Sequence, residues 1–282
     1  MAQITADMIK ELRERSGVGI GKCKEALEVN SGDMNEAIDW LRKSGMASAV
    51  KKEGRATNEG QIGIGKSDVT TAVVEINAET DFVVNNEKFQ QFLQNIADEI
   101  AKTKPASLEK FILQKFSADT NMTIDEYRAS FIQTIGENIQ IRRFAIFEKN
   151  GNHSLGFYSH LGGKIVTVVE IEGSGDEEAL AKDIAMHVAA AAPDYVSPEQ
   201  VPQDVIDREK EIYKTQLKGK PEQIMDKILT GKINSFFNEI CLTRQNYIRD
   251  DKVSIEELVN ARGKEVGKPL KITRFIRWAI GQ

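Results

Sequence analysis

The sequence predicts an α+β protein in which helices cover antiparallel sheets. Two runs have the residues of buried strands and share the order Val-Val-Glu-Ile, at Val73–Ile76 and Val168–Ile171. Each run closes an expected hairpin and leads into a segment with the apolar spacing of an amphipathic helix. We therefore expect two related α+β halves, preceded by a small three-helix module and interrupted by a projecting helical hairpin.

The composition is that of an ordinary globular protein without a strong charge bias. Of 282 residues, 40% are hydrophobic and 29% charged, which suits two or three modules. The net charge of -5 argues against nucleic acid as a partner. The two cysteines, Cys23 and Cys241, indicate neither disulfides nor zinc and fit a reducing cytoplasm. Residues 1–10 do not resemble a signal peptide, and no apolar run is long enough to cross a membrane.

Residues 1–45 are expected to form the three-helix module. Apolar stripes separated by glycine-containing turns define three short helices. Asp33 with Glu36 resembles a capping box that opens the third helix, and Gly45 is its expected end. The polar, basic stretch at 46–60 is assigned to a linker.

The first turn of this module is a candidate binding surface. Residues 17–21 can expose Val18 and Ile20 beside Arg13. Alternatively, both apolar side chains belong to the core or to an ordinary helix surface, where scattered apolar residues are normal. The residues alone leave both interpretations open.

Residues 60–67, GQIGIGKS, satisfy the spacing of a phosphate-binding P-loop. A P-loop needs a buried strand before it and a helix that begins at the Lys-Ser pair, so that backbone N–H groups surround the phosphates. Here a charged segment precedes the motif, a strand follows it, and Ile62 and Ile64 alternate as in a strand. We expect a β-hairpin that turns at Lys66–Asp68, and we keep a P-loop nucleotide-binding enzyme as the alternative function.

The stretch after this hairpin places an aromatic residue between a strand and a helix. Thr80, Asp81, Phe82 and Val83 form this junction, and polar residues flank the phenyl ring. Loops that present such residues often carry binding function. A second interpretation makes Phe82 a hydrophobic staple packed on Phe89 or on the helix, with Thr80 or Asp81 as the helix N-cap.

We assign residues 61–138 to the first half of the core and residues 139–200 and 239–282 to the second. Between these, residues 201–238 contain two amphipathic helical patterns joined at 219–221, Gly-Lys-Pro. A short break of this kind predicts an antiparallel helical hairpin that projects from the core.

The sequence offers no catalytic constellation. It lacks a GxSxG nucleophile elbow and any His/Cys/Asp cluster with metal-ligand spacing. His187, in an Ala-rich helical segment, has no second ligand in register and is expected to be a hydrogen-bonded core residue. We therefore expect no covalent enzyme, no cofactor and no metal.

Two long signatures resemble those of the elongation factor Ts family. Residues 75–83, EINAETDFV, resemble its Glu-aliphatic-Asn-x-Gln/Glu-Thr-Asp-Phe-Val signature, and residues 12–27, LRERSGVGIGKCKEAL, resemble its first one. Further similar stretches, in family order, are Gly136–Arg143 (GENIQIRR), Tyr158–His160 and Ile184–Ala190 (IAMHVAA). The positions that depart from the commonest family form are Ser16, Ala78 and Val84.

The resemblance implies a guanine-nucleotide exchange factor. Such a protein binds elongation factor Tu in its GDP-bound and nucleotide-free forms, disturbs the Mg²⁺ and nucleotide site, and promotes GDP release during translation elongation in the cytoplasm. The resemblance also implies a ubiquitin-associated-type fold for the N-terminal module and a coiled-coil protrusion for the helical hairpin. A homodimer through this hairpin is left open.

The resemblance further implies where elongation factor Tu is contacted. Phe82 would act as a steric wedge in its nucleotide-binding domain, with Asp81 as the polar partner. The N-terminal module would dock on the same domain, and the second half of the core on the third domain. The implied contact residues are Arg13, Ile20, Thr80, Asp81, Phe82, Val83 and His160.

Overall fold

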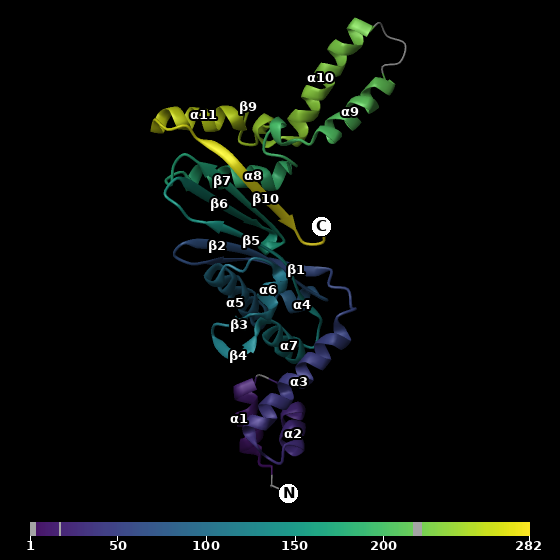
Figure 1. Ribbon diagram of the computed structural model, residues 1–282, viewed down its shortest axis with the longest axis vertical. Coiled ribbons are helices and arrows are strands. Elements are labelled where there is room, and N and C mark those ends of the chain that lie inside the picture. Colours follow the sequence, from purple (N-terminus) through teal and green to yellow (C-terminus); the bar gives the residue numbers. More distant parts are fainter. Residues whose placement is uncertain (1–3, 17, 217–221) are drawn as a thin grey trace. The chain divides into compact units, whose positions relative to one another are not determined.

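The structure is a computed structural model that describes residues 4–16, 18–216 and 222–282. The chain divides into two compact units, Met1–Glu148 with Ile280–Gln282, and Lys149–Ala279. Each unit contains a three-stranded antiparallel sheet, a two-stranded sheet and several helices (Figure 1). The predicted α+β class is confirmed.

Three helices open the first unit, as predicted: α1 (Ala6–Ser16), α2 (Ile20–Val29) and α3 (Met34–Lys52). Asp33 caps the third helix, because its carboxylate accepts hydrogen bonds from the N–H groups of Asn35 and Glu36, both at 2.9 Å. The apolar faces of the helices meet in a small core. Its buried members are Leu12, Val18, Cys23, Ala26, Leu27, Ala37 and Leu41.

The third helix passes Gly45, its predicted end, and continues to Lys52. The linker predicted at 46–60 is therefore wrong over most of its length. The helix occupies its first part, and the first strand, β1 (Glu59–Lys66), begins within its last part.

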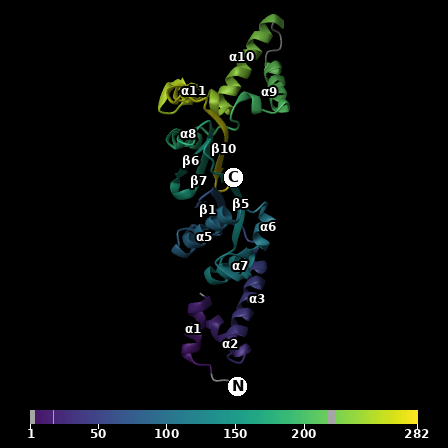
Figure 2. The ribbon, with the colours of Figure 1, turned by 60° about the vertical axis from the view of Figure 1, so that its left-hand side comes forward.

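The reason is a contact between α3 and α7 (Ile124–Ile135), which run beside each other (Figure 2). A Cβ atom at Gly45 would lie 3.1 Å from Oε1 of Gln133, so the small residue lets the helices approach closely. Met46 and Ala49, further along α3, join the core of the unit. Glycine destabilises a helix interior by only about 1 kcal/mol relative to alanine, and the packing of α3 against α7 offsets this loss.

The sheet of the first unit has the order β1-β2-β5 and is antiparallel throughout, with strands β2 (Thr70–Ala78) and β5 (Ile139–Glu148). The predicted hairpin of β1 and β2 is confirmed. β5 also belongs to this sheet, although we assigned residues 139–200 to the second half. It joins the free edge of β2 after several intervening elements, and alternation alone does not show which strand it pairs with.

Helix α5 (Glu87–Thr103) packs against β1 and β2. Its Phe92 stacks on Phe131 of α7 with ring centroids 4.5 Å apart, which ties the two helices into one core. A capping box of Thr123 and Glu126 opens α7. The remaining elements of this unit are α4 (Asp81–Val84), α6 (Leu108–Leu113), β3 (Lys115–Phe116) and β4 (Asp119–Thr123).

The second unit repeats this plan. Its antiparallel sheet has the order β6-β7-β10, from β6 (His153–His160), β7 (Ile165–Glu172) and β10 (Lys271–Ala279). Helix α8 (Glu178–Ala191) packs against β6 and β7, as α5 does in the first unit. The remaining elements are η1 (Leu161–Gly163), η2 (Pro198–Gln200), α9 (Gln203–Gln216), α10 (Glu222–Ile240), η3 (Leu242–Arg244), β8 (Asn246–Tyr247), β9 (Asp250–Ser254) and α11 (Ile255–Val266).

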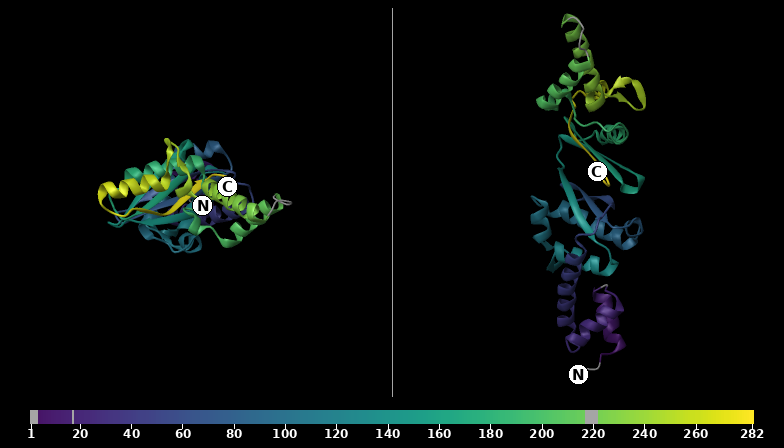
Figure 3. Two further views of the ribbon diagram at one scale, coloured as in Figure 1. Left: turned by 90° about the horizontal axis from the view of Figure 1, so that it is seen from above. Right: turned by 90° about the vertical axis from the view of Figure 1, so that its right-hand side faces the viewer.

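Helices α9 and α10 lie side by side (Figures 1 and 3). They correspond to the two helices predicted within residues 201–238. The turn predicted at 219–221 lies outside the described residues.

The two sheets share an ion pair at equivalent places. Nε of Arg143 lies 2.7 Å from Oε2 of Glu75, and Nε of Arg274 lies 2.8 Å from Oε2 of Glu170. In both sheets the strand register shifts by one residue beside the pair, as at a β-bulge. The shared Val-Val-Glu-Ile order therefore marks a structural repeat.

Glycine lets each hairpin touch the backbone of its helix. A Cβ atom at Gly65 of β1 would lie 2.1 Å from the backbone carbon of Ala97 in α5. A Cβ atom at Gly156 of β6 would lie 2.0 Å from that of Ala181 in α8. No side chain fits at such distances, so both halves depend on glycine at this contact.

We expect Gly65→Ala to lower the melting temperature by several degrees, because overpacking against a helix backbone typically costs about 1–3 kcal/mol. Gly151→Ala is the matched control, since nothing lies within 4 Å of its added Cβ atom. Thermal unfolding followed by circular dichroism measures both variants. Equal melting temperatures for the two would mean that strand and helix do not touch here.

His187 in α8 is buried and hydrogen-bonded on both ring nitrogens. Its Nε2 lies 3.0 Å from Oε1 of Gln245, and the N–H of Ile248 donates to Nδ1 at 3.3 Å. This pattern requires a neutral ring with its proton on Nε2. The predicted core histidine is confirmed, and burial lowers the pKa of His187 below its usual value.

Acid should therefore destabilise the protein through His187. The unfolded chain protonates this ring near pH 6.5 while the folded state holds it neutral, so stability falls as the pH drops below about 6.5. His187→Gln keeps a polar side chain that does not titrate, and its melting temperature should fall less between about pH 7.5 and 5.5. His160→Gln, at an exposed histidine, is the control. An unchanged acid response in His187→Gln would rule out this residue as the cause.

Candidate functional site

A single helical turn, α4, carries the Thr-Asp-Phe-Val stretch. Thr80 is its N-cap, and the hydroxyl oxygen accepts a hydrogen bond from the N–H of Val83 at 3.4 Å. At the other end, the side chain of Gln90 donates to the carbonyl oxygen of Val84 at 2.6 Å. Val83 and Val84 are buried in the core of the first unit, whereas Phe82 is 85% exposed. The turn anchors itself through its valines and presents the phenyl ring to solvent.

The exposure of this ring decides between the two interpretations of the junction. The staple hypothesis is wrong, because Phe82 is exposed while Phe89 is buried beside Phe131. The N-cap is Thr80, as one alternative predicted, and Asp81 is exposed. An exposed aromatic side chain on an ordered turn is typical of a binding residue.

Glu137 and Asn138, which are distant in sequence, form hydrogen bonds with the residues at the start of α4. Both donors of Thr80 reach the carboxylate of Glu137, the N–H at 3.0 Å from Oε2 and the hydroxyl at 2.7 Å from Oε1. In return, the N–H of Asn138 donates to Oε1 of Glu79 at 2.6 Å. The family resemblance pointed to Gly136–Arg143, but no role was predicted for Glu137, because nothing local in the sequence shows that it meets Thr80.

The two residues predicted in the N-terminal helices are exposed. Arg13 lies on α1, and Ile20, the first residue of α2, is 56% exposed. Val18 is only 3% exposed and packs in the core of these helices. Of the two apolar residues considered for this turn, Ile20 alone is therefore available to a partner.

His160 lies in the second unit, at the end of β6, and is exposed. Its Nδ1 is 3.2 Å from the hydroxyl oxygen of Tyr158, and the two rings stack with centroids 6.0 Å apart. The next residue, Leu161, was not predicted. It is 66% exposed and has a φ of 50°, a conformation that is strained for a leucine. An exposed apolar side chain on strained backbone is often functional, so we add Leu161 to the candidate site.

The P-loop spacing at residues 60–67 does not form a P-loop. Strand β1 occupies most of it and pairs with β2, and no helix begins at Lys66 or Ser67. Its glycines serve packing, since a Cβ atom at Gly63 would lie 2.8 Å from the side chain of Leu93. The predicted hairpin accounts for the motif.

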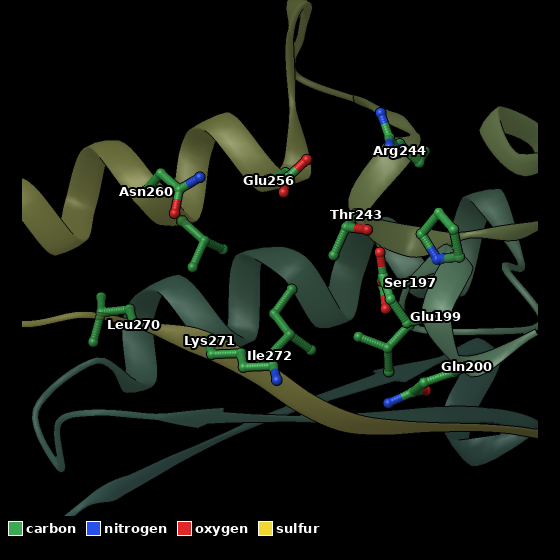
Figure 4. Close-up of a pocket in the computed structure, with 13 residues that line it drawn as sticks. Ser197, Glu199, Gln200, Thr243, Arg244, Glu256, Asn260, Leu270, Lys271 and Ile272 are labelled. Atoms are coloured by element: carbon green, nitrogen blue, oxygen red, sulfur yellow. The ribbon is translucent and has the colours of Figure 1, made fainter. Parts of the chain in front are cut away.

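The second unit contains a cavity of about 450 Å³ (Figure 4). Helix α11 contributes Glu256 and Asn260 on one side, and the segment that carries Lys271 and Ile272 runs along the other. None of the predicted contact residues lines it. The cavity is therefore not part of the candidate site.

The described residues contain no group of three or more His, Cys, Asp and Glu that could hold a metal ion. Both cysteines are buried and unpaired, and burial raises the pKa of Cys241 to about 11, which keeps it a thiol. None of the helices in the described ranges has the length and apolar character needed to span a bilayer.

Comparison with known proteins identifies the family. The family model described as Elongation factor TS matches residues 79–282. An elongation factor Ts of Protochlamydia amoebophila is 62% identical over 282 residues, and those of Chlamydia muridarum and Chlamydia felis are 44% and 43% identical over 281 and 282 residues. In each case the similarity covers 100% of both chains. The chain belongs to the elongation factor Ts family.

Membership of the elongation factor Ts family makes the chain a translation elongation factor, as the two signatures implied. The matched region begins at Glu79, so it includes the turn that carries Phe82. The full-length relatives also cover the N-terminal helices, where Arg13 and Ile20 lie.

Because Phe82 is exposed, we expect Phe82→Ala to change the free energy of unfolding by no more than about 0.5 kcal/mol. Phe89→Ala is the contrasting variant, since truncation of a buried phenylalanine costs about 3–5 kcal/mol. Thermal unfolding of the two variants measures the difference. Similar losses in both would restore the staple interpretation.

Proposed function

We propose that the chain binds elongation factor Tu carrying GDP and promotes release of the nucleotide, so that GTP can bind. The observation that carries this proposal is the exposed ring of Phe82 on a turn whose two ends are hydrogen-bonded. A preorganised apolar side chain can enter a partner without the entropic cost of ordering a mobile loop.

In this mechanism Phe82 inserts between helices of the nucleotide-binding domain of elongation factor Tu. The insertion displaces the segment that organises Mg²⁺, and GDP then leaves. Asp81, which is exposed beside the ring, engages polar groups of the partner, and Thr80 and Val83 hold the turn in shape. The exchange requires no covalent step and no cofactor from this chain.

The magnitudes show that Phe82 cannot act alone. A change in nucleotide affinity of roughly 10⁴-fold needs about 5.5 kcal/mol of differential binding. Burial of one phenylalanine side chain supplies about 1.5–3 kcal/mol. Further contacts must supply the rest, and the exposed residues Arg13, Ile20, His160 and Leu161 are our candidates for them.

Thermodynamic linkage allows such a protein to be released and to act repeatedly. If it weakens the affinity of elongation factor Tu for nucleotide, then rebinding of nucleotide weakens its own affinity by the same factor. Both the GDP-bound and the nucleotide-free forms of elongation factor Tu are therefore partners, and we place the reaction in the cytoplasm. A homodimer through α9 and α10 stays a prediction, and nucleic acid and membranes remain outside the proposal.

We expect Phe82→Ala to slow exchange strongly. In stopped-flow release of a fluorescent GDP analogue from elongation factor Tu, the variant should be about tenfold to a hundredfold less effective, because the lost burial is worth about 1.5–3 kcal/mol. Leu113→Ala is the matched control, since Leu113 is 74% exposed and has no proposed role.

Two outcomes would contradict the proposal. The unaltered protein could fail to accelerate GDP release at saturation, or Phe82→Ala could be as active as Leu113→Ala. The alternative P-loop function predicts instead that the isolated chain binds nucleotide and that Lys66→Ala abolishes this binding.

A further inference from the structure

We infer that Glu137 is a positioning residue for Phe82, acting through a cluster that we call the strand-end clasp: Glu79, Thr80, Glu137 and Asn138. This inference rests on the proposed function and extends it, because it assigns a role to a residue outside the Thr-Asp-Phe-Val stretch. The clasp joins the end of β2 to the segment that leads into β5.

The clasp is reciprocal. The carboxylate of Glu137 accepts both donors of Thr80, at 3.0 and 2.7 Å, and the carboxylate of Glu79 accepts the N–H of Asn138 at 2.6 Å. Hydrogen bonds to a charged acceptor are short and roughly twice as strong as those between neutral groups. Two charged acceptors thus fix the backbone immediately before Phe82.

The clasp also holds the chain that arrives from α3. The side-chain amide of Asn138 donates to the carbonyl oxygens of Glu53 and Arg55, at 3.2 and 3.0 Å. The guanidinium of Arg55 lies 3.4 Å from the carboxylate of Glu79. The segment after the N-terminal helices and the turn that carries Phe82 therefore share one anchor.

The second unit shows whether the sheet needs an acidic residue at the position of Glu137 in order to fold. Glu137 precedes Arg143 by the same chain distance as Lys268 precedes Arg274, and both arginines pair with the Glu of Val-Val-Glu-Ile. Lys268 thus occupies the place of Glu137 in the second unit, where its Nζ lies 3.5 Å from Oγ of Ser174.

In the second unit the turn after the corresponding strand, residues 173–176, is Gly-Ser-Gly-Asp and carries no aromatic residue. The same sheet order and the same ion pair form there without a carboxylate at position 268. The sheet plan does not require an acidic residue at this place. A carboxylate that accepts two hydrogen bonds, that of Glu137, occurs in the first unit, where the turn carries Phe82.

The first test asks whether Glu137 orders the turn in the free protein. Hydrogen–deuterium exchange of backbone amides, followed by NMR, should show faster exchange at Thr80 and Val83 in Glu137→Ala, by about tenfold. Glu137→Gln keeps one acceptor oxygen and should fall between Glu137→Ala and the unaltered protein. Lys268→Ala is the matched control and should leave both amides unchanged.

The second test asks whether this order serves exchange. In stopped-flow release of the fluorescent GDP analogue, Glu137→Ala should lower the maximal rate about fivefold to tenfold, in proportion to the lost order. If Glu137 acts through Phe82, adding Glu137→Ala to Phe82→Ala should slow release less than twofold further. A residue that only supports folding would instead multiply its effect with that of Phe82→Ala.

The outcomes separate this inference from the proposed function. Unchanged amide exchange in Glu137→Ala, or multiplicative effects in the double variant, would overturn the positioning role while Phe82→Ala still tests the function. Loss of exchange activity in Lys268→Ala equal to that in Glu137→Ala would also overturn it. If neither Phe82→Ala nor Glu137→Ala alters GDP release, both the proposed function and the positioning role fail.

Discussion

The register between β2 and β5 determines the position of the turn that carries Phe82. Ala78 at the end of β2 lies opposite Ile139 at the start of β5, so residues just beyond these two strand ends have to be neighbours. Thr80 and Glu137 are such neighbours, and their hydrogen bonds continue the contact past the last ladder pair. The interaction that builds the sheet therefore also fixes the backbone that carries Phe82.

The second unit shows the same scaffold with a different strand end. Its sheet order, its ion pair and its glycine contact with a helix repeat those of the first unit. At the strand end, however, Gly173 has a φ of 113°, and a Cβ atom there would lie 2.1 Å from the carbonyl oxygen of Pro269. Backbone approaches backbone directly at Gly173, and just beyond it the side chains of Lys268 and Ser174 lie 3.5 Å apart where the first unit has a carboxylate. The halves share the contacts that hold sheet to helix and differ in the turn after the strand.

The sequence predicted the features that local rules determine and failed where a distant contact decides. The β1–β2 hairpin, the Asp33 cap and the buried His187 follow from residue type and spacing, and the structure contains all three. The sequence predicts that α3 ends at Gly45, because glycine commonly ends a helix. The packing of α3 on α7, which extends the helix to Lys52, cannot be seen in the local sequence. For the same reason β5 was assigned to the wrong half, and the contact between Thr80 and Glu137 was not foreseen. The family signatures pointed to the candidate site, and the fold shows which distant residues contact its turn.

The exposed apolar residues of the candidate site also differ in how much backbone strain accompanies their exposure. Phe82 sits on a capped turn with buried valines, so its exposure is compatible with a stable backbone. Leu161 adopts a φ of 50°, a conformation that is strained for a leucine. Local rules are commonly broken where function requires it, and the loss of stability is offset elsewhere. Strain at Leu161 is therefore a ground, independent of the family resemblance, for including this residue in the candidate site.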